Sequence, residues 1–578
     1  MNKSKKAILI SIIFFLVFPL TVFASQVEEN INEDIHIPTE PENGIPLLIL
    51  TVYEDEAVID KANEEDEEHV YGDIDLINNS IDHQVRGKGN IEIILPENFE
   101  SEYGSVDIPE GPQELDYVRG RGNSSWFRKK KPYKIKFEEP KSFLGMKENK
   151  EWGLLANYTD KTLISNAIIM HTAKELGMEY TIKMVPVDFV MKGTKSGDSY
   201  LGSYYLTELV DIGNGRVEIP ELKKKETENI TGGYLLSLYF EEQDYDKPKS
   251  TVFTTKYSGL ELINENPEFE SEDLSEGRKL QRDYIRNYID EIDDIIINNE
   301  KIDKKTHDRL NELMDLKSLA DFYLIQEFFI NIDAFRTSSN YLYKKPNDKI
   351  YWGPLWDFDF IFYKSELDIP DTYHGFNCHL DNPWIDNLRF KDEEFASLLH
   401  ERWKELEPLI ESLTKEGGII DKYNQRGLKS WEDNNKIWPR DYEINNEEEI
   451  EKLRKFIELR RQWFNNNINN IDKEFFTISY EVDGKIVEKE SVKSYSYVVD
   501  FSIEPQKEGY VYDGWINKQT GEKAEFFKIE NDITLIPDFK KIDEIDSKIS
   551  LILENANNLP VVPDGYQKAF TLRNNTKY

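Results

Sequence analysis

Apolar and polar residues alternate along the first part of the chain in the manner of short strands. The run from Ile45 to Val52 is almost wholly apolar, which is typical of a buried strand. Strands are also predicted where β-branched and aromatic residues recur between turn residues, over 72–77, 91–95, 133–137, 185–191, 202–209 and 232–236. The acid-rich run 54–68 is predicted to be a solvated loop. The N-terminal part of the chain is therefore expected to be mostly β.

A helical period dominates the middle of the chain. Apolar residues recur at helical spacing over 162–176, 280–298, 317–330, 392–414 and 447–470. Thr159-Asp160 is a predicted cap for the first of these helices, and Gly177 ends it. From about 475 the pattern returns to short strands and turns. This separation of strands from helices predicts an α+β fold with a β-rich N-terminal part, a helical lobe and a small β module.

The stretch 331–359 carries candidate chemistry. Asp333 follows a hydrophobic helix, and an alternating segment from Asn340 leads into a predicted hairpin with a turn at 346–348. The returning strand would bring Asp357 back toward Asn340 and Asp333. Two carboxylates and an amide oxygen can hold Mg²⁺ and position a hydroxyl nucleophile. Asp and Asn are also ordinary turn residues, so spacing alone leaves both interpretations open.

A second candidate is basic. The segment 118–126 reads VRGRGNSSW and contains Arg121 and Ser124, and it leads into KKKPYKIKF, in which Lys134 and Lys136 share one face of a strand. Glycines allow a close approach to phosphate and lysines neutralise its charge, so a phosphate cradle is one interpretation. A solvent-facing hairpin with a basic outer edge is the other. Glu208, at the end of a later strand, could pair with a lysine or be solvated.

Composition and charge narrow the class of protein. The chain has 578 residues and a net charge of −39, which argues against general binding of nucleic acid or anionic membranes and is compatible with a basic partner. Its only cysteine, Cys378, excludes an intramolecular disulfide and a thiolate metal cage, and with His379 it is expected to serve packing.

The N-terminus resembles an export signal. Three lysines precede the apolar run 7–23, which ends in a small-residue cleavage pattern before Ser25. We expect a signal peptide over 1–24, with an uncleaved anchor as the alternative, a flexible linker over 25–44, and a poorly ordered tail over 541–578. The protein is expected to be secreted or to reside at the cell surface.

Several ordered motifs together resemble the spore coat protein H kinase family, also called CotH-like kinases. They are RGRGNSSW with KKPYKIKF, WGLLANYTDKTLISN, GSYYLTEL, GGYLL, NIDAFRTSSNYLY and WGPLWDFD, spread over about 46–470. The resemblance implies an atypical protein-kinase-like fold and phosphate transfer from ATP to protein side chains. In one departure, Ser165 stands before Asn166 where many relatives carry arginine.

The resemblance also implies roles for residues. Asp333 would accept or orient the substrate hydroxyl, and Asn340 and Asp357 would hold Mg²⁺ against the ATP phosphates. Lys134 would pair with phosphate, with Lys136 or Lys131 as alternatives in register. Arg121 and Ser124 would contact the nucleotide, Glu208 would be the partner carboxylate of the lysine, and Asp359 is either a second metal ligand or a polar strand-end residue.

The implied function is therefore a secreted kinase that acts on Ser or Thr of a protein, and a basic, Ser/Thr-rich substrate is expected. The alternative is a noncatalytic spore-coat or cell-surface assembly protein, and a hydrolase using the paired acids ranks behind both. The segment 474–540 resembles the Listeria-Bacteroides type repeat through KEGYVYDGW and NDITLIPDF. That resemblance implies a small β-grasp-like module that contacts surface or spore-coat proteins of a Gram-positive-type bacterium.

Overall fold

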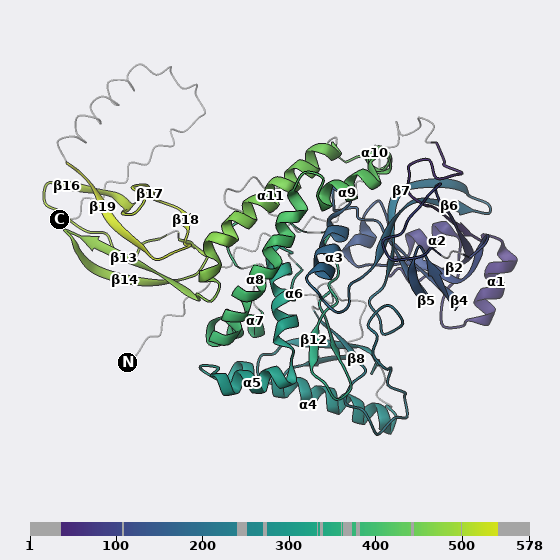
Figure 1. The fold of residues 1–578 in the computed structure, drawn as a ribbon, viewed down its shortest axis with the longest axis horizontal. Helices are drawn as coiled ribbons and strands as arrows, with labels where there is room; N and C mark the ends of the chain where they lie inside the picture. Colours follow the sequence, from purple (N-terminus) through teal and green to yellow (C-terminus); the bar gives the residue numbers. More distant parts are fainter. Residues whose placement is uncertain are drawn as a thin grey trace, which may run out of the picture.

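The computed structural model describes residues 36–106, 109–239, 251–269, 274–331, 333–335, 339–359, 361, 373–376, 382–440, 444–498 and 500–541. The expected signal peptide, most of the linker, Cys378, His379 and nearly all of the tail lie outside these residues. A strand-rich part, a helical part and a small C-terminal sheet follow one another along the long axis (Figure 1). The predicted α+β class is confirmed.

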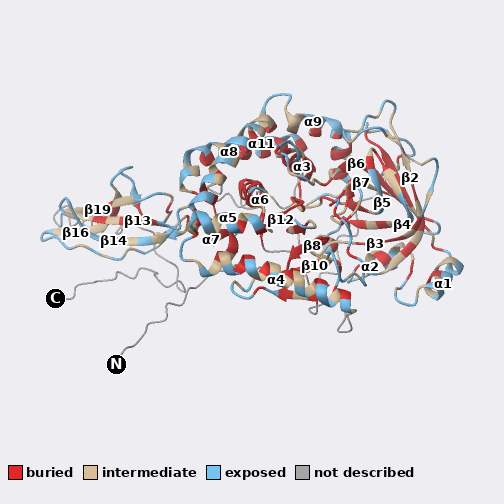
Figure 2. Cartoon of the chain, turned by 60° about the horizontal axis from the view of Figure 1, so that its bottom comes forward, coloured by how far each residue is buried: buried red, intermediate tan, exposed pale blue. Residues whose placement is uncertain are grey.

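The strand-rich part is a closed barrel. Its seven strands follow one another in the order β1 (Leu47–Val52), β2 (Arg86–Ile94), β3 (Gln113–Gly120), β4 (Tyr133–Phe143), β5 (Met146–Leu155), β7 (Gly197–Glu208) and β6 (Met184–Gly193). β1 closes the barrel because it pairs in parallel with β6 and antiparallel with β2. Ile135, Trp152 and Val187 belong to one buried apolar cluster of this part. Buried residues recur along its strands (Figure 2). Closure leaves the main sheet of this part without an edge.

Two predictions near the N-terminus are wrong. The acid-rich run forms a helix, α1 (Glu56–Glu65), of which only Ala62 is buried. Glu, Lys and Ala are good helix formers, so a solvated charge run can still be helical. The predicted strand at 72–77 is α2 (Ile74–Asn79), because the Asp73 carboxylate accepts a hydrogen bond from the Leu76 amide and caps a helix there.

The helical part surrounds a second sheet. Its strand order is β12 (Ile350–Trp352), β11 (Tyr341–Lys344), β8 (Tyr234–Leu238), β10 (Glu261–Asn266) and β9 (Val252–Thr254). The helices are α3 (Ser165–Glu175), α4 (Glu276–Asn298), α5 (Lys304–Leu313), α6 (Leu316–Phe328), α7 (Pro383–Lys391), α8 (Glu393–Thr414), α9 (Ile419–Arg426), α10 (Leu428–Ile437) and α11 (Asn446–Asn467). All five predicted helices are confirmed, whereas α5, α7, α9 and α10 were not predicted.

Helix α10, in the helical part, is bound to the barrel by buried polar contacts. The Lys130 amine is buried and donates hydrogen bonds to the Ala156 carbonyl and to Asn434 Oδ1, each at 2.7 Å. Burial lowers the pKa of Lys130 well below its usual value. On the same helix, Ser430 Oγ donates to the buried Asp188 carboxylate at 2.5 Å. The barrel and the helical part therefore share an interior.

The C-terminal module consists of short strands, as the sequence predicts, in a main sheet and a smaller two-stranded sheet. Its strands are β13 (Phe475–Val482), β14 (Lys485–Lys493), β15 (Tyr497–Val498), β16 (Tyr510–Asn517), β17 (Lys523–Ala524), β18 (Phe527–Lys528) and β19 (Ile533–Lys541). The main sheet has the order β14-β13-β19-β16-β17, and β13 and β19 run in parallel. Side chains such as Phe476 and Tyr495 belong to the same apolar core as the helical part. The module is thus packed against the helical part.

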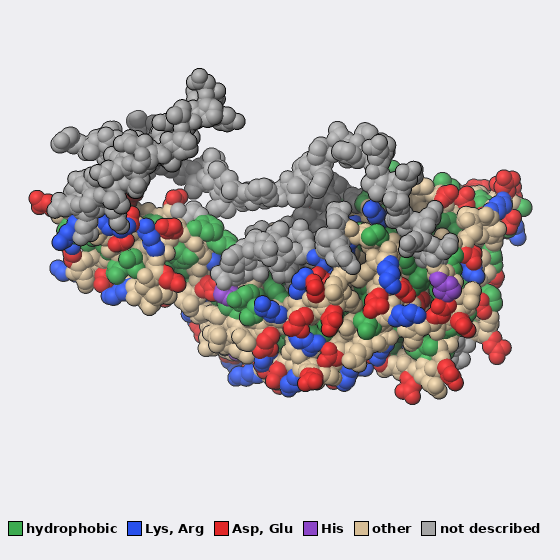
Figure 3. Space-filling view, turned by 90° about the horizontal axis from the view of Figure 1, so that it is seen from above, with side chains coloured by type: hydrophobic (Ala, Val, Ile, Leu, Met, Phe, Trp, Pro, Cys, Tyr) green, Lys and Arg blue, Asp and Glu red, His purple; other side chains and the backbone are tan. Residues whose placement is uncertain are grey.

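The surface and the helices bear on the expected environment of the chain. Acidic and basic side chains are interspersed over the face drawn in Figure 3, which shows no single basic track. Among the described residues, no helix combines the length and the apolar character needed to cross a bilayer.

Candidate active site

The loop after α6 carries Asp333 and is fixed by Asn340. The Asn340 Nδ2 donates to the Asp333 carbonyl at 2.9 Å, and its Oδ1 accepts from the Phe335 amide at 2.9 Å. The predicted hairpin is confirmed as β11 and β12, with Asn340 directly before β11. Asn340 is buried, so its amide side chain spans the loop from within. Asn340 and Asp333 are therefore neighbours in space.

Asp357 returns to the same loop after β12. Ser339 Oγ donates to Asp357 Oδ2 at 3.0 Å, and Asn331 Nδ2 donates to the Asp357 carbonyl at 3.1 Å. The backbone of Asp357 is left-handed, with φ of 67°. A non-glycine residue rarely adopts this conformation unless its surroundings fix it. Asp333, Asn340 and Asp357 therefore lie on segments that are directly bonded to one another.

Asp359 and Asp357 interact electrostatically. The hydroxyl of Thr159 donates a hydrogen bond to Asp359 Oδ2. Burial, followed by the charge of Asp357, raises the pKa of Asp359 well above its usual value. A cation bound between the two carboxylates would relieve this repulsion.

A metal ion at this pair would need further oxygen ligands. The described residues contain no group of three or more His, Cys, Asp and Glu side chains that could hold a metal. Mg²⁺ is commonly held by one or two carboxylates together with substrate phosphates. The pair fits that kind of magnesium site, and Asn340 Oδ1 accepts from the Phe335 amide in the loop next to it in sequence.

Arg121 connects the glycine turn to the acids. Its guanidinium carbon lies 5.3 Å from the centre of the Trp356 ring. Burial lowers the pKa of Arg121, and the charge of Asp357 opposes that shift. Ser124 is exposed at the start of a short 3-10 helix (Ser124–Phe127) in the same turn. The structure thus brings Arg121 to the acidic pair across more than 200 residues of sequence.

The lysines on β4 face a carboxylate on the next strand. Lys134 Nζ lies 2.7 Å from Glu151 Oε2, and Lys136 Nζ lies 3.8 Å from Glu151 Oε1. Burial lowers the pKa of Lys134, and the charge of Glu151 opposes that shift. Lys131 instead closes the turn, where its amine donates to the Trp126 carbonyl at 2.7 Å. Lys134 is therefore the more tightly held of the two lysines on this face.

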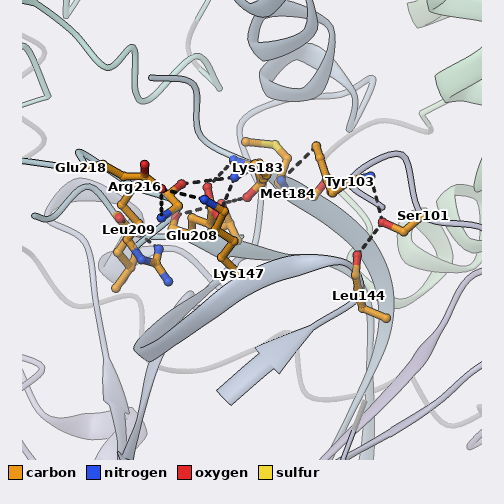
Figure 4. Close-up of polar contacts among 12 residues, drawn as sticks. Ser101, Tyr103, Leu144, Lys147, Lys183, Met184, Glu208, Leu209, Arg216 and Glu218 are labelled. Atoms are coloured by element: carbon orange, nitrogen blue, oxygen red, sulfur yellow. Dashed lines mark hydrogen bonds and ion pairs between the residues drawn. The ribbon is translucent and has the colours of Figure 1, made fainter. Parts of the chain in front are cut away.

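The expected pairing of Glu208 with the phosphate-binding lysine is wrong. The Glu208 carboxylate accepts from the Lys183 amide at 3.0 Å and lies 3.2 Å from Lys183 Nζ (Figure 4). Glu208 is opposite Trp152, whereas Lys136 is opposite Glu151. Neighbouring residues of a strand point to opposite faces of a sheet. Glu208 therefore projects from the other face of the barrel wall, and Glu151 is the partner of Lys134.

Burial raises the pKa of Glu208, and Lys183 and Arg216 oppose that shift. The Arg216 guanidinium also donates to the Leu209 carbonyl at 3.1 Å and to the Glu151 carbonyl at 2.9 Å. This network holds the end of β7 against the strand that carries Glu151.

The segment around the start of α3 contains Asn166, to which the sequence assigned no role. Asn166 Oδ1 accepts from the Phe358 amide at 2.8 Å, between the two acids. Ser165 is buried at the first position of α3, and its amide donates to Asp160 Oδ2 at 2.8 Å. The predicted cap at Thr159-Asp160 is wrong in position, because Ile164 is the N-cap residue of α3 and Asp160 accepts the first helical amide from outside the helix. The motif WGLLANYTDKTLISN signalled this segment, but it did not show that Asn166 reaches Phe358.

Comparison with known proteins agrees with this assembly. The family model described as CotH kinase protein matches residues 118–464. The match covers the basic turn, the loop of Asp333 and the acidic pair, and it ends before the C-terminal module. A search of curated proteins found no match. Because the family model covers more than half of the sequence, the chain belongs to the CotH kinase family.

Proposed function

We propose that this protein is an exported kinase that transfers the γ-phosphate of ATP to Ser or Thr side chains of a protein. The observation that carries the proposal is the contact of Arg121 with the segment of Asp357 and Asp359. Arg121 is also close enough to Lys134 for its charge to lower the pKa of that lysine, which supports a site with both basic and acidic groups. Phosphoryl transfer needs both kinds of charge, because triphosphate is polyanionic and is bound with Mg²⁺.

Each residue then has a role. Asp333 orients the substrate hydroxyl and accepts its proton, and Asn340 keeps the Asp333 loop in place through the 2.9 Å hydrogen bond to its carbonyl. Lys134 and Arg121 bind phosphate oxygens. Asp357, with Asn340 and Asp359, would hold Mg²⁺, which neutralises charge on the phosphates when bound.

The test is phosphate transfer by the full mature chain with labelled ATP and Mg²⁺. Asp333→Ala and Asp357→Ala are each expected to lower the transfer rate by about 10³-fold or more, since the reaction depends on positioning and charge stabilisation. Asp348→Ala is the matched control, because Asp348 lies in the turn of the same hairpin and is exposed. Equal incorporation by all three variants would refute the assignment.

Calorimetry separates the second candidate function. The buried Ser165 at the start of α3, where many relatives carry arginine, favours a noncatalytic assembly role for this chain. Titration of ATP with Mg²⁺ into the mature chain is expected to release heat with saturation. If neither Mg²⁺ nor Mn²⁺ supports ATP binding, the assembly role replaces the kinase, with the C-terminal module as its contact surface.

A further inference from the structure

A short segment, 373–376, lies between the C-terminal module and the helical part. His374 Nδ1 lies 2.6 Å from Glu530 Oε1, and Trp463 Nε1 donates to Glu530 Oε2 at 3.1 Å. Lys528 Nζ also donates to the His374 carbonyl at 3.0 Å. The His374 and Glu530 side chains are 19% and 20% exposed, so water screens their contact only in part. The module therefore holds this segment through both a side chain and the backbone.

Tyr495 makes the apolar half of the same contact. It is buried, and its ring lies 5.5 Å from that of Phe376 and 5.7 Å from that of Trp463, both edge to face. Its backbone is left-handed, with φ of 61°. A bulky residue holds such a conformation only where its surroundings determine it. The turn of the module that carries Tyr495 is thus shaped to fit the helical part.

On its other side, segment 373–376 is hydrogen-bonded to Arg460, which also contacts the helix that precedes the candidate active site. The Arg460 guanidinium on α11 donates to the Tyr373 carbonyl at 2.7 Å and to the Gly375 carbonyl at 2.8 Å. The same group lies 3.1 Å from Glu327 Oε1, and both side chains are 1% exposed. Glu327 is in the last turn of α6, which leads to Asn331 and the Asp333 loop. The buried Arg460 guanidinium therefore connects segment 373–376 to α6, the helix that precedes the Asp333 loop.

We propose that the C-terminal module supports the geometry of the kinase active site, with Glu530 as a positioning residue. By holding His374, Glu530 keeps segment 373–376 in the place where Arg460 can bind it together with the end of α6. The base of the Asp333 loop is then fixed from two sides. The catalytic consequence rests on the proposed function, whereas the positioning of 373–376 does not.

The test uses the full mature chain and two matched variants. Glu530→Ala removes the acceptor of His374 and Trp463. Glu481→Ala is the control, because Glu481 is in the same module, has a side chain that is 16% exposed and lies 2.7 Å from Lys518. Hydrogen exchange is followed by mass spectrometry in peptides that cover 373–376 and 327–331. In Glu530→Ala, exchange of both peptides is expected to rise about tenfold, and in Glu481→Ala neither should change.

Kinetics supply a readout that loss of module stability alone would not give. In Glu530→Ala, kcat is expected to fall about tenfold with the KM for ATP unchanged, as for an interaction needed in the transition state. Glu530→Gln should restore most of kcat, because its amide can accept from Trp463 and donate to a neutral His374. Unchanged exchange, equal change in both alanine variants, or unchanged kcat would each overturn the proposal. If the wild-type chain transfers no phosphate, the proposed function fails and the exchange result still decides the positioning.

Discussion

The two lysines on β4 provide a discriminating test of the candidate site. Lys134 and Lys136 are two residues apart on one strand face, and both lie near Glu151. Their amines differ in contact, since that of Lys134 is 2.7 Å from the carboxylate and that of Lys136 is 3.8 Å away. Lys134→Met and Lys136→Met remove the same charge from the same strand. Only the first is expected to remove the phosphate-binding amine.

The expected magnitudes separate catalysis from stability. An ion pair of partly exposed side chains contributes about 1 kcal/mol or less to folding, so each variant should lose no more than that from the free energy of unfolding. A preorganised donor to a reacting phosphate contributes about 3–4 kcal/mol, which corresponds to roughly 10²–10³ in kcat. Lys134→Met should therefore fold normally and transfer phosphate at least a hundredfold more slowly. Lys136→Met should remain within about threefold of the wild type.

The assay is steady-state transfer from ATP at saturating Mg²⁺, together with denaturant unfolding of each variant. Glu151→Gln is a third variant for the same assay, because it keeps the size of the side chain and removes the charge beside Lys134. It is expected to lower kcat about tenfold. Equal rates for the two methionine variants would refute the choice of Lys134, and a loss of folding in Lys134→Met would refute the separation of catalysis from stability.

Two further predictions concern the acidic segment and the hairpin. Asn166→Ala should slow transfer about 10–10²-fold, because the Phe358 amide between the two acids loses its acceptor. Thr172→Val, on the same helix, is the control and should leave the rate unchanged. Equal rates for the two variants would contradict a positioning role for Asn166. Burial lowers the pKa of Lys344 to about 8, so between pH 8 and about 10.5 the unfolded chain binds more protons than the folded one and stability rises with pH. Relative to Lys344→Met, the free energy of unfolding should rise by about 2 kcal/mol across that range after allowance for screening, and an unchanged difference in denaturant titrations would contradict the shift. Lys349→Met, on the same hairpin and with 28% of its side chain exposed, is the control.

Local patterns predicted much of the fold. The apolar run that forms β1, the alternating strand β4 and the hairpin of β11 and β12 are set by residues close in sequence, so period and turn chemistry were sufficient. Helix α1 was missed because a charge run can be a solvated loop or a solvated helix, and the apolar period that distinguishes them is nearly absent. Helix α6 is buried along almost its whole length, and the helical spacing of its apolar residues predicted it.

The sequence predicted most residues of the candidate site but not which of them contact one another. The acids and the amide around the hairpin were found because one local turn brings them together. The partner of Lys134 depends on the register of β4 against β5, and the contact of Arg121 with Trp356 depends on how two distant segments meet. Nothing in the local sequence determines either. Glu208 was chosen for its place at a strand end, and the side of the barrel wall to which it points decided against it.

The buried amine of Lys130 has a consequence for the order in which the chain folds. The amine bonds to Asn434, 304 residues later, and β1 must pair with β6 to close the barrel. Contacts between residues so distant in sequence form late, because a long loop must be closed first. Chains that end before α10 would leave the Lys130 amine one acceptor short in an apolar wall. Synthesis must therefore pass residue 434 before the first 200 residues can reach their final stability.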